Sequence, residues 1–315
     1  MLDQANTHTG GTTVSAGTLR ITNPDAVGSS AVSVPAGGTL EVASGTVMRS
    51  PSVTLSGGSL SAGTLAVNAA TGIGTLRINN GSLSPTATLE IGDGGRVEMP
   101  QANRVSLSVA SLSFPPANTP ADGDFSVLAS GGVLDLGAGE ISVAAGGLDA
   151  TEIRDALIAG RNGGSWDGDS GIISSAASAA AAGTRAVGYI VNPDGSGTVS
   201  FAAPGDTDLN GQVNVFDLVT IDASGTYGSG GASVWNDGDF NYDGVTNVFD
   251  LIGIDGAGVY GAGDYFPSSP TATGLTTAAV PEPGMLAVLA AAGAAVAAGW
   301  RRRVRMARHP AAGRR

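Results

Sequence analysis

Apolar and polar residues alternate through residues 1–113, and five short phrases of the same kind carry the alternation. Each phrase has glycine or alanine first, a hydroxylated residue second and leucine third. A period of two is typical of a strand with one buried face, and Gly-Gly, Asn-Gly and Asp-Gly pairs between the phrases indicate turns. The five predicted strands contain Gly17–Ile21, Gly38–Val42, Gly58–Leu60, Gly74–Ile78 and Ala87–Ile91.

The spacing of these phrases predicts how the strands are arranged. Successive phrases begin 21, 20, 16 and 13 residues apart, and a loose repeat near this length indicates a parallel β-solenoid. Residues 1–113 contain no Phe, Trp or Tyr, as expected for a narrow core of stacked Val, Leu and Ile in which Leu40 is buried. We therefore expect a mainly β protein whose residues 1–150 form a parallel β-helix of about seven coils. An ordinary β-sandwich is the alternative.

Residues 151–204 are predicted to connect the solenoid to the rest of the chain. A short helix is expected to about Ala159, with Thr151 or Ala150 near its N-cap. The turn signal Asn192–Gly195 lies between two alternating segments and predicts a β-hairpin. Trp166 is expected to pack the two parts of the chain together rather than to bind a ligand.

Two acidic loops, 33 residues apart, repeat each other: 13 of the 25 positions aligned from Asp206 and from Asp239 are identical. Each loop offers side-chain oxygens at positions 1, 3, 5, 9 and 12 and a backbone carbonyl at position 7, with Gly211 or Gly244 at position 6. Calcium takes about six to eight oxygens, and a loop of about 12 residues surrounds it only with a sharp turn at position 6. The predicted ligands are Asp206, Asp208, Asn210, Gln212, Asn214 and Asp217 in the first loop, and Asp239, Asn241, Asp243, Val245, Asn247 and Asp250 in the second.

Each loop is followed by a segment that can form about two helical turns, Val215–Ala223 or Val248–Asp255, whereas the Pro- and Gly-containing segments before the loops cannot end long helices. A calcium loop with only an exiting helix is half of an EF-hand, and two such units over residues 205–264 resemble a type I dockerin. The resemblance implies two Ca²⁺ ions in a compact module. Position 12 is Asp rather than the usual Glu, which shortens the reach of that carboxylate. Two acidic turns without a metal are the alternative.

Positions 10 and 11 of the loops are the bulky pairs Val215-Phe216 and Val248-Phe249. In dockerins this pair contacts a cohesin partner and is often small or hydroxylated. We expect the bulky pairs to pack the two units together instead. The resemblance therefore leaves binding of a cohesin-like partner open.

The C-terminal part of the sequence begins with a linker over residues 265–279. Pro281-Glu282-Pro283 follows, then an uncharged Ala-rich run of 17 residues from Gly284 to Trp300, and then Arg301-Arg302-Arg303. This run is at the short end of what crosses a bilayer, and the arginines hold the end of the chain in the cytoplasm. The order resembles the PEP-CTERM sorting signal. The resemblance implies a C-terminal transmembrane helix, transient residence in the inner membrane, and processing by an exosortase-type enzyme at Pro-Glu-Pro. A permanent tail anchor is the alternative.

The opening stretch, residues 5–45, resembles the autotransporter-associated β-strand repeat, a family of β-helical rods on exported proteins. An exported protein needs a signal peptide, but Met1–Gly10 has neither a charged n-region nor an apolar h-region. We therefore expect the reading frame to start inside a repeat, with a signal peptide and further coils upstream.

Composition and charge argue against several classes of function. Residues 114–283 hold 21 acidic residues and three Arg, so this acidic segment disfavours nucleic acid as a partner. The chain has no cysteine, hence no disulfide or thiolate site. Its only two histidines are His8 at the start and His309 in the tail, which argues against a His-based triad. The carboxylates closest to a glycosidase pair are Glu90 and Asp93, in a segment without the aromatic rings on which sugars stack.

Together these features predict a non-enzymatic, exported cell-surface or extracellular-matrix protein. The solenoid would be a spacer or adhesive rod, the calcium module would stabilise it, and the tail would sort it. The candidate partners are an exosortase-type enzyme, the inner membrane, an exopolysaccharide and a cohesin-like protein. The alternative is a dockerin-bearing component of a polysaccharide-degrading system, either a scaffold subunit or a β-helical carbohydrate-active enzyme.

Overall fold

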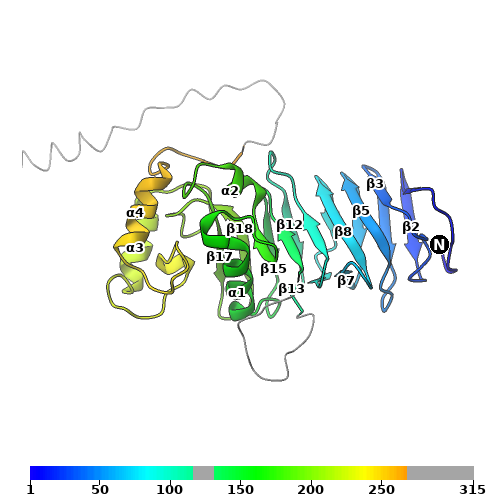
Figure 1. The fold of residues 1–315 in the computed structure, drawn as a ribbon, viewed down its shortest axis with the longest axis horizontal. Helices are drawn as coiled ribbons and strands as arrows, with labels where there is room; N and C mark the ends of the chain where they lie inside the picture. The colour runs from blue at the N-terminus through cyan, green and yellow to red at the C-terminus, as the bar shows by residue number, and fades with distance from the viewer. Residues whose placement is uncertain (116–130, 268–315) are drawn as a thin grey trace, which may run out of the picture. The chain divides into compact units, whose positions relative to one another are not determined.

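The computed structural model describes residues 1–115 and 131–267, all of which belong to one compact unit, Met1–Pro270 (Figure 1). Its largest sheet has ten strands, seven of which stack in parallel in one continuous row, called the long sheet below. One residue from each of six strands falls in a single buried column, Val32, Val53, Leu76, Val97, Leu134 and Ile172. The strands are β1 (Thr12–Thr13), β3 (Val32–Pro35), β5 (Ser50–Ser56), β8 (Ile73–Asn79), β11 (Arg96–Glu98), β14 (Val133–Asp135) and β16 (Gly171–Ile173).

Two further faces complete the coils. One is a four-stranded parallel sheet of β2 (Gly17–Ile21), β4 (Gly38–Val42), β6 (Ser59–Ser61) and β9 (Ser82–Leu83). Its column is Leu19, Leu40, Leu60 and Leu83, and Leu40 is fully buried as predicted. The other pairs β7 (Thr64–Val67), β10 (Thr88–Ile91) and β13 (Ser111–Ser113). The predicted parallel β-solenoid is therefore confirmed. The four strands of the β2 sheet give about four regular turns, so the prediction of about seven coils is too high for this part.

The structure also corrects which phrases are equivalent. The first three predicted phrases do stack, in β2, β4 and β6. The fourth, Gly74–Ile78, lies in β8 of the long sheet, and the fifth lies in β10 on the third face. The last two phrases follow at short spacings because they lie on different faces of the solenoid from the third phrase. The residue that stacks on Leu60 of the third phrase is Leu83, 23 residues later.

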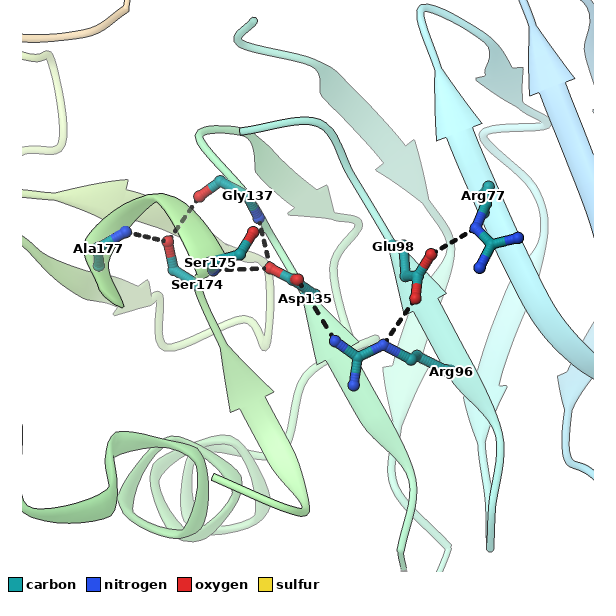
Figure 2. Close-up of polar contacts among 8 residues, drawn as sticks. All are labelled: Arg77, Arg96, Glu98, Asp135, Gly137, Ser174, Ser175 and Ala177. Carbon is teal, nitrogen blue, oxygen red and sulfur yellow. Dashed lines mark hydrogen bonds and ion pairs between the residues drawn. The ribbon is translucent and has the colours of Figure 1, made fainter. Parts of the chain in front are cut away.

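A row of alternating charges crosses the outer side of the long sheet (Figure 2). Arg77 Nε lies 2.6 Å from Glu98, Arg96 Nε lies 2.8 Å from the same carboxylate, and Arg96 also reaches Asp135 at 3.5 Å. The buried Asp135 accepts hydrogen bonds from the N–H groups of Gly137 and Ser175, both at 2.9 Å. Exposed ion pairs contribute little each, so this row orders the last turn mainly through Asp135.

The parallel stacking ends at a hairpin. β12 (Ser106–Val109) and β15 (Glu140–Val143) are parallel, but β18 (Gly197–Ala202) pairs with β15 in the antiparallel sense and with β17 (Ala186–Val191) through the predicted turn at 192–195. An antiparallel strand cannot continue the coil, so the hairpin closes this face of the solenoid.

Helices cover the end of the long sheet. Helix α1 (Ala150–Arg161) packs on β16 so closely that a Cβ at Gly160 would lie 1.8 Å from the carbonyl oxygen of Ile172. Its N-cap is Asp149, whose side chain accepts from Thr151 N and Glu152 N, so the predicted cap at Thr151 or Ala150 is wrong by one or two residues. The short elements η1 (Asn162–Gly164) and α2 (Ser175–Ala179) follow.

The last described part contains α3 (Val215–Ser224), η2 (Trp235–Asp237) and α4 (Val248–Ala257). Both helices begin where predicted and end one or two residues later. No helix in residues 1–115 and 131–267 is long and apolar enough to cross a membrane. The run 284–300, where a transmembrane helix is predicted, lies outside the described residues, as do most of the linker and the Pro-Glu-Pro motif.

Candidate metal centre

Three carboxylates of the first loop converge. Asp206, Asp208 and Asp217 each offer an oxygen within 4.8 Å of the other two. Asp206 and Asp217 are buried and Asp208 is exposed, so the group opens to solvent on one side. Hard oxygen ligands in this arrangement suit Ca²⁺. We call residues 205–264, which contain both loops, the loop module.

The start of α3 fixes Asp217 in this loop. Asn214 is the N-cap, and its side chain accepts from Phe216 N at 2.8 Å. Asp217 completes a capping box by accepting from Asn214 N at 2.9 Å through Oδ2. Its other oxygen accepts from the N–H and the hydroxyl of Thr207, both at 2.9 Å. The helix cap therefore holds position 12 against position 2 of the same loop.

Asp206, at position 1, is held by the turn that follows it. Its Oδ1 accepts from Asn210 N at 3.1 Å, and its Oδ2 accepts from Gly211 N at 2.8 Å. Gly211 has φ +90° and Gly244 has φ +89°, a region that favours glycine, which explains the glycine at position 6 of each loop.

The second loop is held by similar hydrogen bonds, although among the described residues only the first loop brings three carboxylates together. Asp250 accepts from Asn247 N through Oδ2 and from Phe240 N through Oδ1, both at 2.9 Å, and Asp239 Oδ2 accepts from Gly244 N at 2.9 Å. Asp239 is 1% exposed, and its Oδ1 is a buried oxygen with no hydrogen-bond partner. Such an oxygen is costly to bury unless a cation meets it, so this loop also fits Ca²⁺.

Burial disfavours the ionised form of these carboxylates. It raises the pKa of Asp206 to about 7 and the pKa of Asp239 to about 6, and it also raises the pKa of Asp250. The negative charges of Asp217 near Asp206, and of Asp250 near Asp239, act in the same direction. A bound cation would remove this penalty, because it favours the charged form of each ligand.

The remaining predicted ligands are engaged within their loops. Asn210 Oδ1 accepts from Gln212 N at 2.8 Å, and Asn241 Oδ1 accepts from Asp243 N at 2.8 Å. Asp243 Oδ1 accepts from Val245 N at 3.0 Å, and Asn247, like Asn214, caps its helix. Their roles as ligands stay predictions.

The prediction for the Val-Phe pairs is wrong. Phe216 is 75% exposed and Phe249 is 69% exposed, with Val215 and Val248 also exposed. The two units pack through residues further along each helix instead: Ile254 of α4 lies against Gly205, and Ile221 of α3 lies against Gly238. Ile221 and Ile254 thus each link one unit to the other, and both helices present Val-Phe to solvent.

Sequence reasoning missed the residue at position 4 of each loop. Leu209 and Tyr242 have positive φ values, 59° and 64°, and both are buried. Tyr242 stacks on Tyr189 of β17 at 6.1 Å, and its hydroxyl donates to the carbonyl of Val187. A non-glycine residue at positive φ is uncommon, so the strained position 4 aims these side chains at the hairpin.

Two buried tryptophans, Trp166 and Trp235, lie beside Tyr242 and form an aromatic cluster with it. Trp166 is buried and meets Tyr242 edge to face at 5.8 Å, which confirms its predicted packing role. Trp235, fully buried, lies 5.9 Å from Tyr242 and donates from Nε1 to the carbonyl of Asp206 at 2.7 Å. The aromatic cluster therefore joins both loops to the end of the solenoid.

Comparison with known families gives two matches, each to a short part of the chain. Residues 1–21 match the passenger-associated-transport-repeat, in the stretch where the resemblance to autotransporter repeats begins. Residues 279–303 match the PEP-CTERM protein-sorting motif, which implies processing by an exosortase-type enzyme. Neither the curated proteins nor the solved structures include a match to this chain. The chain thus combines a repeat of transported passengers with a sorting signal of exported, cell-surface proteins.

Proposed function

We propose that this chain is a non-enzymatic structural or adhesive protein of the cell surface or extracellular matrix, and that two calcium ions stabilise its loop module on the solenoid. The observation that carries the proposal is the equivalence of the two loops. Each loop buries its position 1 and position 12 carboxylates, with a capping box at position 12 and a hydrogen bond from the position 6 amide to position 1, and Asp239 leaves one buried oxygen unpartnered.

Charge supports a resident cation. Residues 206–264 contain ten acidic residues and no Arg, so the loop module repels itself without a counter-ion. Sites in the weak class, about 10⁻⁴–10⁻³ M, are those of extracellular modules. An exported protein would meet calcium in a range that fills them.

Calorimetric titration of the full chain tests the proposal. The full chain is needed because a fragment of the loop module would expose Tyr242 and Trp235. We expect a stoichiometry of about two ions, abolished in the double variant Asp206→Ala, Asp239→Ala. A wild-type chain that takes up no calcium, or a double variant that binds as well as wild type, would refute the calcium role.

For the tail we propose transient membrane anchoring. The Ala-rich run 284–300 would hold the chain in the inner membrane until an exosortase-type enzyme cleaves near Pro283. The sequence at 281–283 disfavours a helix, since proline fixes its own φ and disfavours helix in the preceding residue. Intact-mass measurement of surface-released protein is expected to find a chain ending near Pro283. Full-length chain confined to the inner-membrane fraction would show a permanent anchor instead.

One observation favours a second candidate, a docking role in a polysaccharide-degrading assembly. The outer faces of α3 and α4 expose apolar side chains at equivalent places, Val215, Phe216 and Val219 on one helix and Val248, Phe249 and Ile252 on the other. A type I cohesin module is the probe. Binding that Phe216→Asp with Phe249→Asp abolishes would establish this role, and no binding at micromolar concentrations would dismiss it.

A further inference from the structure

After α4 the chain turns back and lies along the first loop. We call residues 259–266 the strap. Gly261 N donates to the carbonyl of Val213 at 2.8 Å, and Tyr265 N donates to the carbonyl of Gly211 at 2.9 Å. The strap is therefore tied to the backbone of the first loop at two points.

The side chain of Tyr265 reaches the position 1 carboxylate. Its hydroxyl donates to Asp206 Oδ2, the oxygen that also accepts from Gly211 N. The Tyr265 ring lies 6.3 Å from Phe201 of β18, and the Arg185 guanidinium lies 5.2 Å from its centroid. Oδ2 is thus held by two donors, whereas Oδ1 accepts only from Asn210 N, within the loop, at 3.1 Å. The orientation of Asp206 thus depends on a residue outside the loop.

Phe266 closes the same loop from the solenoid side. Its ring lies so near Gly211 that an added Cβ would be 2.2 Å away. The Arg104 guanidinium lies 3.4 Å from the centroid of Phe266, and Arg104 forms an ion pair with Glu140 of β15. A continuous set of contacts therefore runs from the last coil through the strap to position 6 of the first loop.

Equivalent donors do not appear at the second loop within the described residues. Asp239 Oδ2 accepts from Gly244 N, and Oδ1 has no partner. Arg154 of α1 donates to the carbonyl of Tyr242 in this loop at 3.4 Å. The two loops are alike in sequence but differ in what surrounds them.

We propose that Tyr265 is a positioning residue for the first calcium site, and that calcium in this site and docking of the strap stabilise each other. This proposal rests on the calcium role proposed above. The donor outside the loop fixes the Asp206 carboxylate in its ligating orientation, as outer-shell partners of metal ligands do. The strap contains Tyr265 and Phe266, the first two residues of the predicted linker, and precedes the sorting motif at 281–283. Calcium in the first site would therefore keep the strap, and with it the start of the linker, fixed on the solenoid.

The test is Tyr265→Phe in the full chain, titrated with calcium by calorimetry in the Asp239→Ala background, where only the first site reports. We expect affinity to fall about tenfold or more, the usual cost of losing an outer-shell partner. Tyr265→Phe in the Asp206→Ala background is expected to leave the second site unchanged. Tyr227→Phe is the matched control, because Tyr227 is 48% exposed.

Hydrogen exchange provides the second readout. Calcium is expected to slow exchange of the Gly261 and Tyr265 amides in wild type and to do so less in Tyr265→Phe. The inference would be overturned if Tyr265→Phe bound calcium with wild-type affinity, or if calcium left hydrogen exchange of the strap amides unchanged. Absence of calcium binding in the wild-type chain would instead refute the calcium role itself.

Discussion

In the solenoid the columns of stacked side chains are aliphatic, as in Leu19, Leu40, Leu60 and Leu83, whereas the loop module buries carboxylates beside aromatic rings. Stacked coils contact only their neighbours, so their stability is a sum of similar local terms. The loop module has helices of only ten residues each, which are marginal by themselves. The difference indicates that the solenoid is stabilised by its own repetition and the loop module by a ligand and by its attachment.

The largest expected effect is a charge placed in a solenoid column. Leu40→Asp puts a carboxylate at a fully buried position between Leu19 and Leu60. We expect a loss of more than about 4 kcal/mol, which unfolds the neighbouring coils. Thermal melting followed by circular dichroism measures this loss, and Thr18→Asp, at an exposed position of β2, is the control. An unchanged melting curve for Leu40→Asp would contradict the register of the β2 sheet.

Removal of calcium should affect the loop module and spare the solenoid. At a calcium concentration about 100 times the dissociation constant, each site contributes about 2.7 kcal/mol. Chelation is therefore expected to lower the melting temperature of the transition followed by tryptophan fluorescence, to which the buried Trp166 and Trp235 contribute. The β signal in circular dichroism should persist. Equal losses in both signals would show that the two regions unfold as one cooperative unit.

The calcium-free chain should lose stability as pH rises. The folded-state pKa values of Asp206 and Asp239, about 7 and about 6, lie above the ordinary value of 3.8. The folded state therefore binds more protons than the unfolded state between about pH 4 and 7, and stability falls across this window. Calcium affinity should rise over the same window, because the ligands must be deprotonated. Melting temperatures with chelator and with calcium, measured from pH 4 to 8, should diverge; parallel curves would count against these carboxylates as ligands.

The smallest effect is expected at the attachment of the loop module. Tyr242→Phe removes the hydroxyl that donates to Val187 but keeps the ring against Trp166 and Tyr189. We expect a loss of about 1–2 kcal/mol, the cost of one buried hydrogen bond, in the loop module's transition alone. Tyr227→Phe controls for the substitution itself. A shift in the solenoid transition would show that the hairpin depends on this bond.

By itself the sequence determined the alternation of the strands, the hairpin turn at 192–195, the starts of α3 and α4, and the glycines at position 6 of the loops. These features are local, because they depend on a few neighbouring residues and their allowed φ values. Only the tertiary structure decided which of the three faces of the solenoid contains each phrase. A period of two tells which side chains are buried, but it is the same for strands on all three faces. The tertiary structure also left the Val-Phe pairs in solvent, because Ile221 and Ile254 fill the space between the units. Finally, it brought Tyr265 to Asp206, 59 residues away in the sequence, a contact that no spacing rule predicts because the strap returns only after two helices and two loops have packed on the solenoid.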